Sequence, residues 1–372
     1  MKALSITAAS VISPLGRGVE ENFRRLLEGE EGIREVDDRR FSPGVLPLAL
    51  LPWQELEERF ARDRDPSSFT AFEQLVLLCA GDALEKTGLD PAHPRTALVF
   101  STTKGNVEEL AGREGFSADR LRLAYTAGLL AKELGFSSAP TVISNACISG
   151  VVALIQARRM ILSGHYDHVV VVGADVVSSF IVSGFESFKS LSTKACRPFD
   201  EARDGLSLGE AAAAIVLSRE GGEVELLGGA ISNDANHISG PSRTGEGLLL
   251  AIQKTLGMDR VPDVISAHGT ATLYNDEMES IALKRAGLEG IPVNSLKGVF
   301  GHTLGAAGVL ETALTAEGMV QNVFPGTRGF ARHGVSGGIS LSGSALQMEQ
   351  NLALKTASGF GGCNAALLLK RK

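Results

Sequence analysis

Residues 145–150 read Asn-Ala-Cys-Ile-Ser-Gly, and they open a helical pattern that runs to Leu162. Residues 300–305 read Phe-Gly-His-Thr-Leu-Gly and open a similar pattern. In both motifs a chemically reactive side chain, Cys147 or His302, stands three residues before a glycine, at the start of a helix rich in small residues. Because the two motifs share this layout, we interpret them as corresponding parts of two related halves.

A second pair of similar runs supports this division. Small and aliphatic residues follow Gly209 (Gly-Glu-Ala-Ala-Ala-Ala-Ile-Val-Leu) and Gly362 (Gly-Cys-Asn-Ala-Ala-Leu-Leu-Leu), 62 and 60 residues after the two reactive residues. The sequence therefore predicts two pseudo-symmetric halves, residues 1–219 with the cysteine and residues 220–372 with the histidine. In that arrangement the two reactive residues would face each other across a pseudo-two-fold axis, at two helix N-termini.

Strand-like and helix-like segments alternate along the chain. Ala3–Ile12, Thr96–Phe100 and His168–Val172 read as strands, and Phe72–Thr87 reads as an amphipathic helix. The unbroken apolar run at 168–172 suits a strand covered on both faces. Residues 37–64 carry three prolines and many charges, which predicts an irregular connection with a short helix. The pattern as a whole predicts an α/β fold with a sheet packed between helix layers.

The composition excludes several classes of function. The 372 residues hold 36 Lys and Arg against 43 Asp and Glu, a net charge of −7, so we expect no nucleic-acid partner. No apolar run reaches the roughly 18 residues that cross a bilayer, and no signal-peptide core is visible, so we expect a cytoplasmic protein without a membrane span. The four cysteines form no CxxC pair and the seven histidines show no ligand spacing, which argues against a disulfide scaffold and a metal site.

Cys147 is the candidate nucleophile. A thiol at a helix N-terminus lies in the positive end of the helix dipole, which favours the reactive thiolate at neutral pH. For an isolated cysteine a buried, inert side chain is the more common alternative, and Cys79, inside an apolar stretch, is interpreted that way. Cys196 and Cys363 have no base motif beside them.

Two histidines and a lysine are the candidate partners of Cys147. His268 follows an apolar strand-like pair and precedes glycine and threonine, a pattern typical of open α/β sites, although a turn histidine fits it as well. His302 stands at a helix start, where the dipole disfavours the imidazolium, so we expect a neutral ring that donates a hydrogen bond. Lys297, five residues before His302, is expected to orient the site residues or to balance their charge. Taken alone, a lysine at this position would be interpreted as a solvated surface residue.

One thiol with two neutral imidazoles favours acyl transfer followed by formation of a carbon–carbon bond. A hydrolase needs one base to activate water, whereas two imidazole donors are matched to the oxygen of an enolate.

The motifs around these residues resemble those of the elongating β-ketoacyl-acyl carrier protein synthases, or ketosynthases, of the thiolase superfamily. The resemblance runs from near Ile12 to the C-terminus. The two histidines separate this branch from the ketosynthases that start chains, which carry Cys-His-Asn. The motifs that carry the resemblance are Asn145–Gly150, Arg197–Asp200, Arg203–Gly205, Gly209–Ala211, His268–Thr272, Asn294–Gly298, Gly301–Gly308 and Ser358–Asn364.

The resemblance implies a thiolase-like five-layer αβαβα fold, a dimer, and a reaction that uses no cofactor. It implies that Cys147 takes an acyl group from the phosphopantetheine thioester of an acyl carrier protein. Malonyl-acyl carrier protein would then lose carbon dioxide and condense with that acyl group. His268 and His302 would donate hydrogen bonds to the enolate as it develops.

The resemblance also implies roles for further residues. The backbone N–H groups of Cys147 and Phe360 would form the oxyanion hole, and Phe360, flanked by glycines, would gate the pocket. Thr270 and Thr272 match threonines that bind the pantetheine arm, and Arg203 matches a contact with the carrier protein. The residues that match the family's supporting charged network are Lys297, Asp276, Glu279 and Glu311.

Departures from the family pattern leave the pathway and the partner open. Residues 102–140 and 222–264 are shorter than in relatives, which leaves housekeeping fatty acid elongation and a specialised polyketide or aryl-polyene-like pathway as equal expectations. The dimer is expected to be a homodimer or a heterodimer with a related ketosynthase-like subunit.

Two alternative functions fit parts of the sequence. One is a non-catalytic, chain-length-factor-like subunit, but such subunits typically lose the active cysteine. The other is a degradative thiolase with Cys363 as its second cysteine, although Cys363 matches a structural threonine of ketosynthases.

Overall fold

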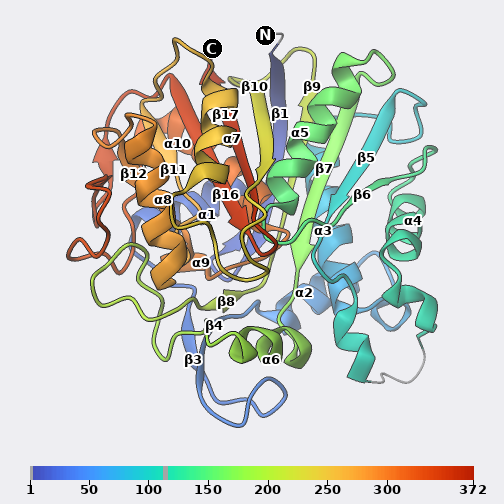
Figure 1. The fold of residues 1–372 in the computed structure, drawn as a ribbon. Helices are drawn as coiled ribbons and strands as arrows, with labels where there is room; N and C mark the ends of the chain where they lie inside the picture. Colours follow the sequence, from blue (N-terminus) through green and yellow to red (C-terminus); the bar gives the residue numbers. More distant parts are fainter. Residues whose placement is uncertain (1–2, 112–115) are drawn as a thin grey trace.

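The computed structural model describes residues 3–111 and 116–372, and a twelve-stranded sheet made of two similar parts runs through it (Figure 1). In the first part the strands lie in the order β1-β9-β7-β5-β6, and in the second in the order β10-β17-β16-β11-β12, extended by β14. The twelfth strand, the two-residue β2 (Gly16–Arg17), pairs with β1 outside this order. Antiparallel pairing of β1 with β10 joins the two parts. The strands are β1 (Leu4–Ser13), β5 (Thr96–Ser101), β6 (Thr141–Ile143), β7 (His168–Asp175), β9 (Ala211–Ser218), β10 (Val224–Asn233), β11 (Val264–Ser266), β12 (Pro292–Asn294), β14 (Ser340–Leu341), β16 (Leu352–Gly359) and β17 (Cys363–Arg371).

The strand directions repeat as well as the strand order. β9 is antiparallel to both of its neighbours, β1 and β7, and β5 and β6 then follow in parallel. β17 is likewise antiparallel to β10 and β16, and the parallel strands β11 and β12 come next. This repetition confirms the α/β class with two pseudo-symmetric halves. The exact division of the chain at residues 219 and 220 stays a prediction.

Helices cover both outer faces of the sheet and fill the space between its two parts. α5 packs against β5 and β7 of the first part and against β10 and β17 of the second, and α10 contacts β7, β9, β11 and β16 in the same way. From outside, α3 packs on the first part and α7 on the second, with α4 and α8 beside them. The expected five layers, αβαβα, are therefore present. These helices are α3 (Ala71–Glu85), α4 (Leu123–Glu133), α5 (Ser149–Leu162), α7 (Glu246–Leu256), α8 (Leu273–Arg285) and α10 (Ala307–Gln321).

The apolar run predicted as a doubly covered strand is β7. Val169 and Val171 pack into the central cluster that holds α5 and α10, whereas Val170 and Val172 pack on the other face, against α3. Successive strand residues point to opposite faces, so only a strand between two helix layers can bury all four valines.

The two central helices, α5 and α10, touch through a glycine on each. A Cβ atom on Gly150 would lie 2.8 Å from the backbone nitrogen of Val309 and 2.9 Å from the Cα atom of Gly308. No side chain fits at either glycine, because the two backbones are in direct contact there. Helices that cross on a pseudo-two-fold axis meet at equivalent residues, so Gly150 corresponds to Gly308.

Backbone angles before the two helices give the same correspondence. Ala146 and Leu304, each four residues before its glycine, have φ angles of 44° and 51°, in the left-handed region that L-residues seldom adopt. In this register Cys147 corresponds to Gly305. The register predicted from the sequence pairs Cys147 with His302 and is therefore wrong by three residues, because it aligns Gly150 with Gly305 instead of Gly308.

The remaining elements surround these layers. β3, β4 and β8 form a separate three-stranded sheet near α6 (Figure 1). Residues 37–64 contain the predicted short helix, α2, and also the strand β4, which was not predicted. Residues 112–115, inside the segment interpreted as shortened, lie outside the described residues. Among the helices described, none has both the length and the apolarity to cross a membrane. The remaining helices are α1 (Val19–Leu27), α2 (Trp53–Phe60), α6 (Ser179–Ser187) and α9 (Lys297–Phe300), and the short strands are β2 (Gly16–Arg17), β3 (Arg34–Val36), β4 (Leu46–Ala49), β8 (Leu208–Gly209), β13 (Val323–Phe324) and β15 (Leu346–Gln347).

Candidate active site

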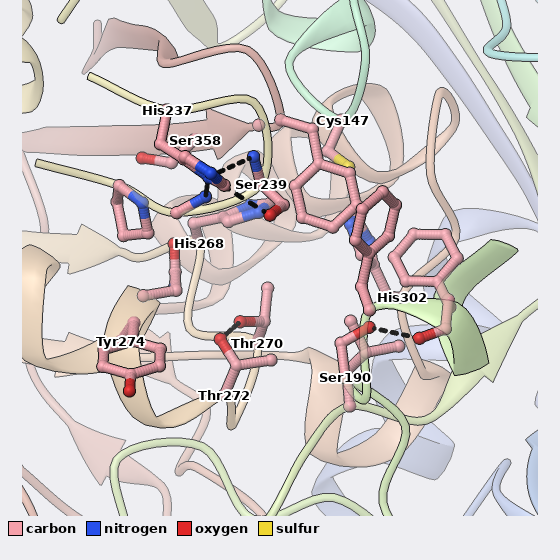
Figure 2. A pocket seen from close by; sticks show the side chains of 18 of the residues that line it. Cys147, Ser190, His237, Ser239, His268, Thr270, Thr272, Tyr274, His302 and Ser358 are labelled. Carbon is pink, nitrogen blue, oxygen red and sulfur yellow. Dashed lines mark hydrogen bonds between the residues drawn. The ribbon is translucent and has the colours of Figure 1, made fainter.

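A cavity of about 380 Å³ gathers the candidate residues of both halves (Figure 2). Cys147 reaches it from the connection between β6 and α5, His268 from the loop after β11, and His302 from the turn after α9. Phe360 reaches it from the turn between β16 and β17. The structure thus brings together four residues that are separated by up to 213 positions in the chain.

A tight turn places Cys147 at the cavity wall. The hydroxyl of Ser149 accepts the N–H of Asn145 at 2.7 Å and donates to the carbonyl of Ala146 at 2.6 Å, which holds the strained backbone before the cysteine. The cysteine is 7% exposed, and the backbone N–H of Phe360 is hydrogen-bonded to its sulfur.

The thiol of Cys147 is not the low-pKa group that the sequence predicts. Burial raises the pKa of the thiol to about 12, and the charge of Lys297 offsets only part of that rise. α5 begins at Ser149, two residues after the cysteine, so the sulfur is close to the helix end but is also removed from water. The expectation of a stabilised thiolate is therefore wrong for the free enzyme, because desolvation outweighs the favourable charges.

The two histidines stand edge to face beside the cysteine. The ring centroids of His268 and His302 are 5.2 Å apart, with an angle of 84° between the planes, and both side chains are buried. Burial lowers the pKa of each ring well below its ordinary value, and the nearby charge of Lys297 lowers it further. Both rings are therefore neutral at pH 7, as expected from the sequence for His302.

The neighbouring backbone selects the tautomer of His302. The N–H of Leu304 donates to Nδ1 of His302 at 3.4 Å, so Nδ1 acts as the acceptor and the proton belongs on Nε2. Nε2 is buried and has no hydrogen-bond partner among the described residues. An unpaired donor in a buried site is costly unless a ligand completes it, so this N–H is suited to a substrate oxygen.

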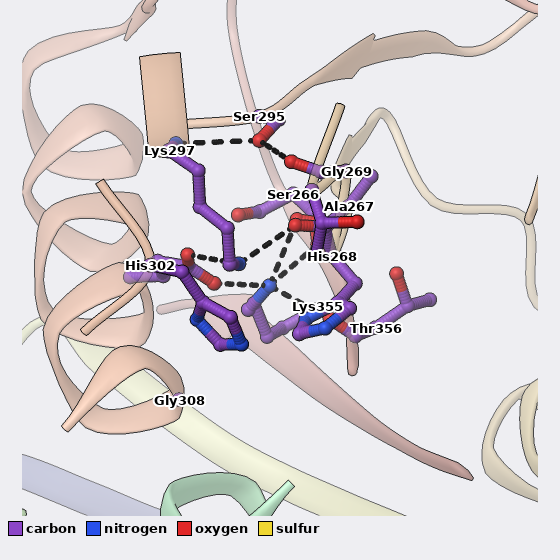
Figure 3. Close-up of polar contacts among 12 residues, drawn as sticks. Ser266, Ala267, His268, Gly269, Ser295, Lys297, His302, Gly308, Lys355 and Thr356 are labelled. Atoms are coloured by element: carbon purple, nitrogen blue, oxygen red, sulfur yellow. Dashed lines mark hydrogen bonds and ion pairs between the residues drawn. The ribbon is translucent and has the colours of Figure 1, made fainter. Parts of the chain in front are cut away.

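A buried charged network lies behind the histidines (Figure 3). The ammonium group of Lys297 donates to the carbonyl of His268 at 2.7 Å and to Glu311 at 2.6 Å. The carboxylate of Glu279 accepts the N–H groups of His268 and Gly269, both at 2.8 Å. Sequence analysis missed one member, Lys355, which pairs with Glu311 from β16 at 2.6 Å. Its only signal in the sequence is that it is the single charged residue of the strand Leu352–Gly359.

Asp276 anchors the loop that carries the two threonines. Its carboxylate accepts the N–H of Thr270 at 2.9 Å and the N–H of Phe199 at 2.7 Å. Burial raises the pKa of this carboxyl group to about 6, although the hydrogen bond from Phe199 acts to lower it. The hydroxyls of Thr270 and Thr272 are 3.0 Å apart and lie on the same side of the cavity (Figure 2). The match of these two threonines to residues that bind a pantetheine arm stays a prediction.

An aromatic cluster lines the cavity at Phe360. The rings of Phe185 and Phe188, from the C-terminal end of α6, lie 5.5 and 5.2 Å from the ring of Phe360. Gly361 and Gly362 follow it with φ angles of 84° and 72°, which only glycine adopts easily. Sequence analysis identified Phe360 but neither of its partners, because aromatic residues on a short helix carry no motif.

Arg203 is a buried residue. The side chain is 5% exposed, and its guanidinium donates to the carbonyls of Asp200, Gly334 and Leu273. This burial argues against the predicted contact of Arg203 with a carrier protein, which stays a prediction. Nε of Arg203 lies 3.9 Å from a carboxylate oxygen of Asp276. The guanidinium therefore stabilises the loops that pack beside Asp276.

The remaining cysteines differ in environment. Cys79 and Cys196 are buried, and burial raises the pKa of their thiols to about 12 and about 11. Cys363 lines the same cavity as Cys147, and the side-chain amide of Asn233 donates to its sulfur at 3.5 Å. Within residues 3–111 and 116–372, no group of acidic, cysteine and histidine side chains is arranged to hold a metal ion.

Known proteins match this chain along its whole length. The family model described as Beta-ketoacyl synthase, N-terminal domain, matches residues 1–221, and that of the C-terminal domain matches residues 224–331. The 3-oxoacyl-[acyl-carrier-protein] synthase 2 of Rhizobium meliloti (strain 1021) is 30% identical and aligns with 100% of this chain and 99% of its own. The ketoacyl synthase alpha subunit of the tetracenomycin polyketide synthase of Streptomyces glaucescens is 29% identical, over 100% of this chain and 97% of its own.

Solved structures give the same result. A ketosynthase in complex with its chain length factor from Xenorhabdus doucetiae is 27% identical with a TM-score of 0.86, covering 100% of this chain and 98% of that one. The ishigamide ketosynthase/chain length factor is 26% identical with a TM-score of 0.89, covering 100% and 99%. With a cysteine and two neutral histidines on one cavity, a five-layer fold and family models over most of its length, the chain belongs to the β-ketoacyl synthase family.

Proposed function

We propose that the chain is a β-ketoacyl-acyl carrier protein synthase that elongates an acyl chain by decarboxylative Claisen condensation. The observation that carries this proposal is the convergence of Cys147, His268 and His302 on one cavity, with Nε2–H of His302 left for a substrate oxygen. A nucleophile and two neutral donors are what acyl transfer followed by enolate formation requires. We also propose that the halves divide near residues 219 and 220.

In the first step, the sulfur of Cys147 attacks the thioester carbonyl of an acyl-carrier protein. The carbonyl oxygen becomes an oxyanion that the N–H groups of Cys147 and Phe360 stabilise. The carbon–sulfur bond to the carrier then breaks, the thiol proton passes to the departing pantetheine sulfur, and an acyl-cysteine remains. Because burial raises the pKa of the Cys147 thiol above its ordinary value, we propose that this proton leaves during the attack rather than before it.

In the second step, malonyl-carrier protein enters with its thioester oxygen facing His268 and His302. The bond to the carboxylate breaks, carbon dioxide leaves, and the electron pair forms an enolate that the two imidazoles stabilise. The enolate carbon attacks the acyl carbonyl on Cys147, the tetrahedral intermediate collapses to a β-ketoacyl-carrier protein and a Cys147 thiolate, and the thiolate takes a proton from water to restore the thiol. Each preorganised donor of this type is worth about 2.7–4 kcal/mol in other enzymes.

The proposed substrates are carried on the phosphopantetheine of an acyl carrier protein, and the reaction as written needs no other cofactor. We propose a dimer, either of two identical chains or with a related ketosynthase-like subunit. Two similar structures that pair a ketosynthase with a chain length factor support the second form. Free cysteines throughout the chain suit the proposed reducing cytoplasm.

Experiments distinguish the proposed synthase from two other functions, a chain-length-factor-like subunit and a degradative thiolase. A chain-length-factor-like subunit would not release carbon dioxide at all, and a degradative thiolase would depend on Cys363. We expect the purified protein to condense acyl- and malonyl-carrier protein with release of carbon dioxide. Cys147→Ala should abolish the product, and Cys363→Thr should leave it nearly unchanged. Activity that survives Cys147→Ala would contradict the proposal.

The pathway is tested by profiling the acyl products with several carrier proteins. Uniform turnover of medium and long saturated chains on a housekeeping carrier supports fatty acid elongation. Turnover restricted to polyunsaturated or polyketide-like chains on a dedicated carrier supports a specialised pathway.

A further inference from the structure

Lys355 is a fully buried cation that the proposed chemistry does not use. It lies in the middle of β16, and its side chain is 0% exposed. Its ammonium group donates to the carbonyls of Ser266, Ala267 and Thr356 at 3.2, 3.1 and 2.7 Å, and pairs with Glu311 at 2.6 Å (Figure 3). A buried charge persists only where such partners surround it, so the protein maintains this lysine at a considerable desolvation cost.

The partners of Lys355 lead directly to a proposed active-site histidine. β11 and β16 run in parallel with Ser266 opposite Lys355, so the lysine side chain reaches across to the end of β11. Ser266 and Ala267 are the two residues before His268. Lys355 therefore fixes the carbonyls of the strand end from which the imidazole projects.

Two other side chains fix the next backbone atoms of the same segment. Lys297 donates to the carbonyl of His268, and Glu279 accepts the N–H groups of His268 and Gly269. Thr356, the neighbour of Lys355, donates to Glu279 at 2.6 Å, which connects β16 to this second support. Consecutive backbone polar atoms around His268 are thus each fixed by a buried charged side chain.

Glu311 couples the two lysines to each other. One carboxylate oxygen pairs with Lys297 and the other with Lys355, so Glu311 cannot move without disturbing both. Burial opposes ionisation of Glu311, but the two ammonium groups outweigh it and hold its pKa below the ordinary value. Without the charge of Lys355, the carboxylate of Glu311 would be held by Lys297 from one side only, so the direction of Lys297 toward the carbonyl of His268 would be less constrained.

We propose that Lys355 is a positioning residue, which holds the His268 segment so that the imidazoles of His268 and His302 face one substrate oxygen during decarboxylation. This inference rests on the proposed function. Lys355 contacts neither the cavity nor Cys147, so the first acyl transfer does not depend on it. A small displacement of a catalytic group costs on the order of 10²-fold in rate, whereas the fold needs only that the strand remain paired.

The test separates the two half-reactions in Lys355→Met, which preserves the length of the side chain without its charge. Acylation of Cys147 by acyl-carrier protein is followed by intact-protein mass spectrometry. Decarboxylation of malonyl-carrier protein is followed in Cys147→Gln, where the glutamine mimics the acylated cysteine, with and without Lys355→Met. We expect kcat for decarboxylation to fall by on the order of 10²-fold with little change in KM, while the acylation rate of folded enzyme is unchanged.

Two further variants complete the design. Lys370→Met removes an exposed lysine from the neighbouring strand β17 and should leave both half-reactions unchanged. Lys355→Gln retains hydrogen-bond donors without the charge, and it serves if Lys355→Met does not fold; an intermediate loss of decarboxylation alone is expected. Equal loss of both half-reactions, or none in either, overturns the positioning role. If the Cys147→Gln protein itself releases no carbon dioxide, the proposed function fails instead.

Discussion

Gly150 and Gly308 bring the backbones of α5 and α10 into contact, so that a Cβ atom on Gly150 would lie 2.9 Å from the Cα atom of Gly308. This contact fixes where both central helices begin. Cys147 stands three residues before Gly150, and His302 stands six residues before Gly308. The crossing therefore sets the position of the nucleophile from one half relative to a donor from the other.

We expect Gly150→Ala to reduce both stability and activity. The added methyl group would overlap the backbone of α10, and overpacking of this kind typically costs about 1–3 kcal/mol. Thermal unfolding should show a lower midpoint, and acylation of Cys147 should slow because the turn before α5 must move. Gly128→Ala is the matched control, since Gly128 lies in α4, where an added Cβ atom would meet open space, and Gly→Ala changes at such positions gain about 0.4–1 kcal/mol. Equal midpoints for the two variants would refute the contact.

The rate at which Cys147 is alkylated should rise with pH and reach no plateau in the neutral range. Only the thiolate reacts, and with a pKa of about 12 its fraction grows about tenfold for each pH unit below that value. The measurement is the rate of iodoacetamide labelling of the free enzyme, assigned to Cys147 by peptide mass spectrometry, with Cys147→Ala as the blank. A plateau near neutral pH would show that the helix end stabilises the thiolate after all.

His302→Ala should separate enolate formation from acyl transfer. Removal of a preorganised donor costs about 10²–10³-fold in other enzymes, so decarboxylation of malonyl-carrier protein should fall by that factor. Acylation of Cys147, which uses backbone N–H groups, should be little affected. His165→Ala, at an exposed position, is the control and should change neither rate. Loss of acylation equal to the loss of decarboxylation would show that His302 serves the nucleophile instead.

The sequence was sufficient for the fold class and for most of the site because motif residues carry local signals. The apolar run of β7 and the small-residue starts of α5 and α10 are such signals, and the His268 and His302 motifs stand at the ends of β11 and α9. The register between the halves is predicted wrongly, because the corresponding residues are the two glycines, Gly150 and Gly308, at which α5 and α10 cross. Their correspondence depends on a contact between residues 158 positions apart, and no local sequence pattern contains that information.

Burial explains the other differences between the predictions from the sequence and the structure. The pKa of Cys147 and the environment of Arg203 both depend on how completely distant segments exclude water, whereas helix position and charge can be read locally. Lys355 was overlooked for the same reason, since a lysine in a strand signals an exposed edge unless its buried acidic partner is known.

Arg203→Met should destabilise the protein without weakening its interaction with a carrier protein. The guanidinium donates to three backbone carbonyls in a buried site, and hydrogen bonds to charged groups are worth about 1.5–3 kcal/mol each when their partners cannot be rehydrated. We therefore expect a clearly lower unfolding midpoint, with KM for the carrier-bound substrate unchanged in the fraction that remains folded. Arg332→Met is the matched control, because Arg332 is 77% exposed in a surface ion pair with Glu201, and such pairs contribute only about 0–1 kcal/mol. A raised KM at an unchanged midpoint would restore Arg203 to the carrier-protein surface and contradict its buried position.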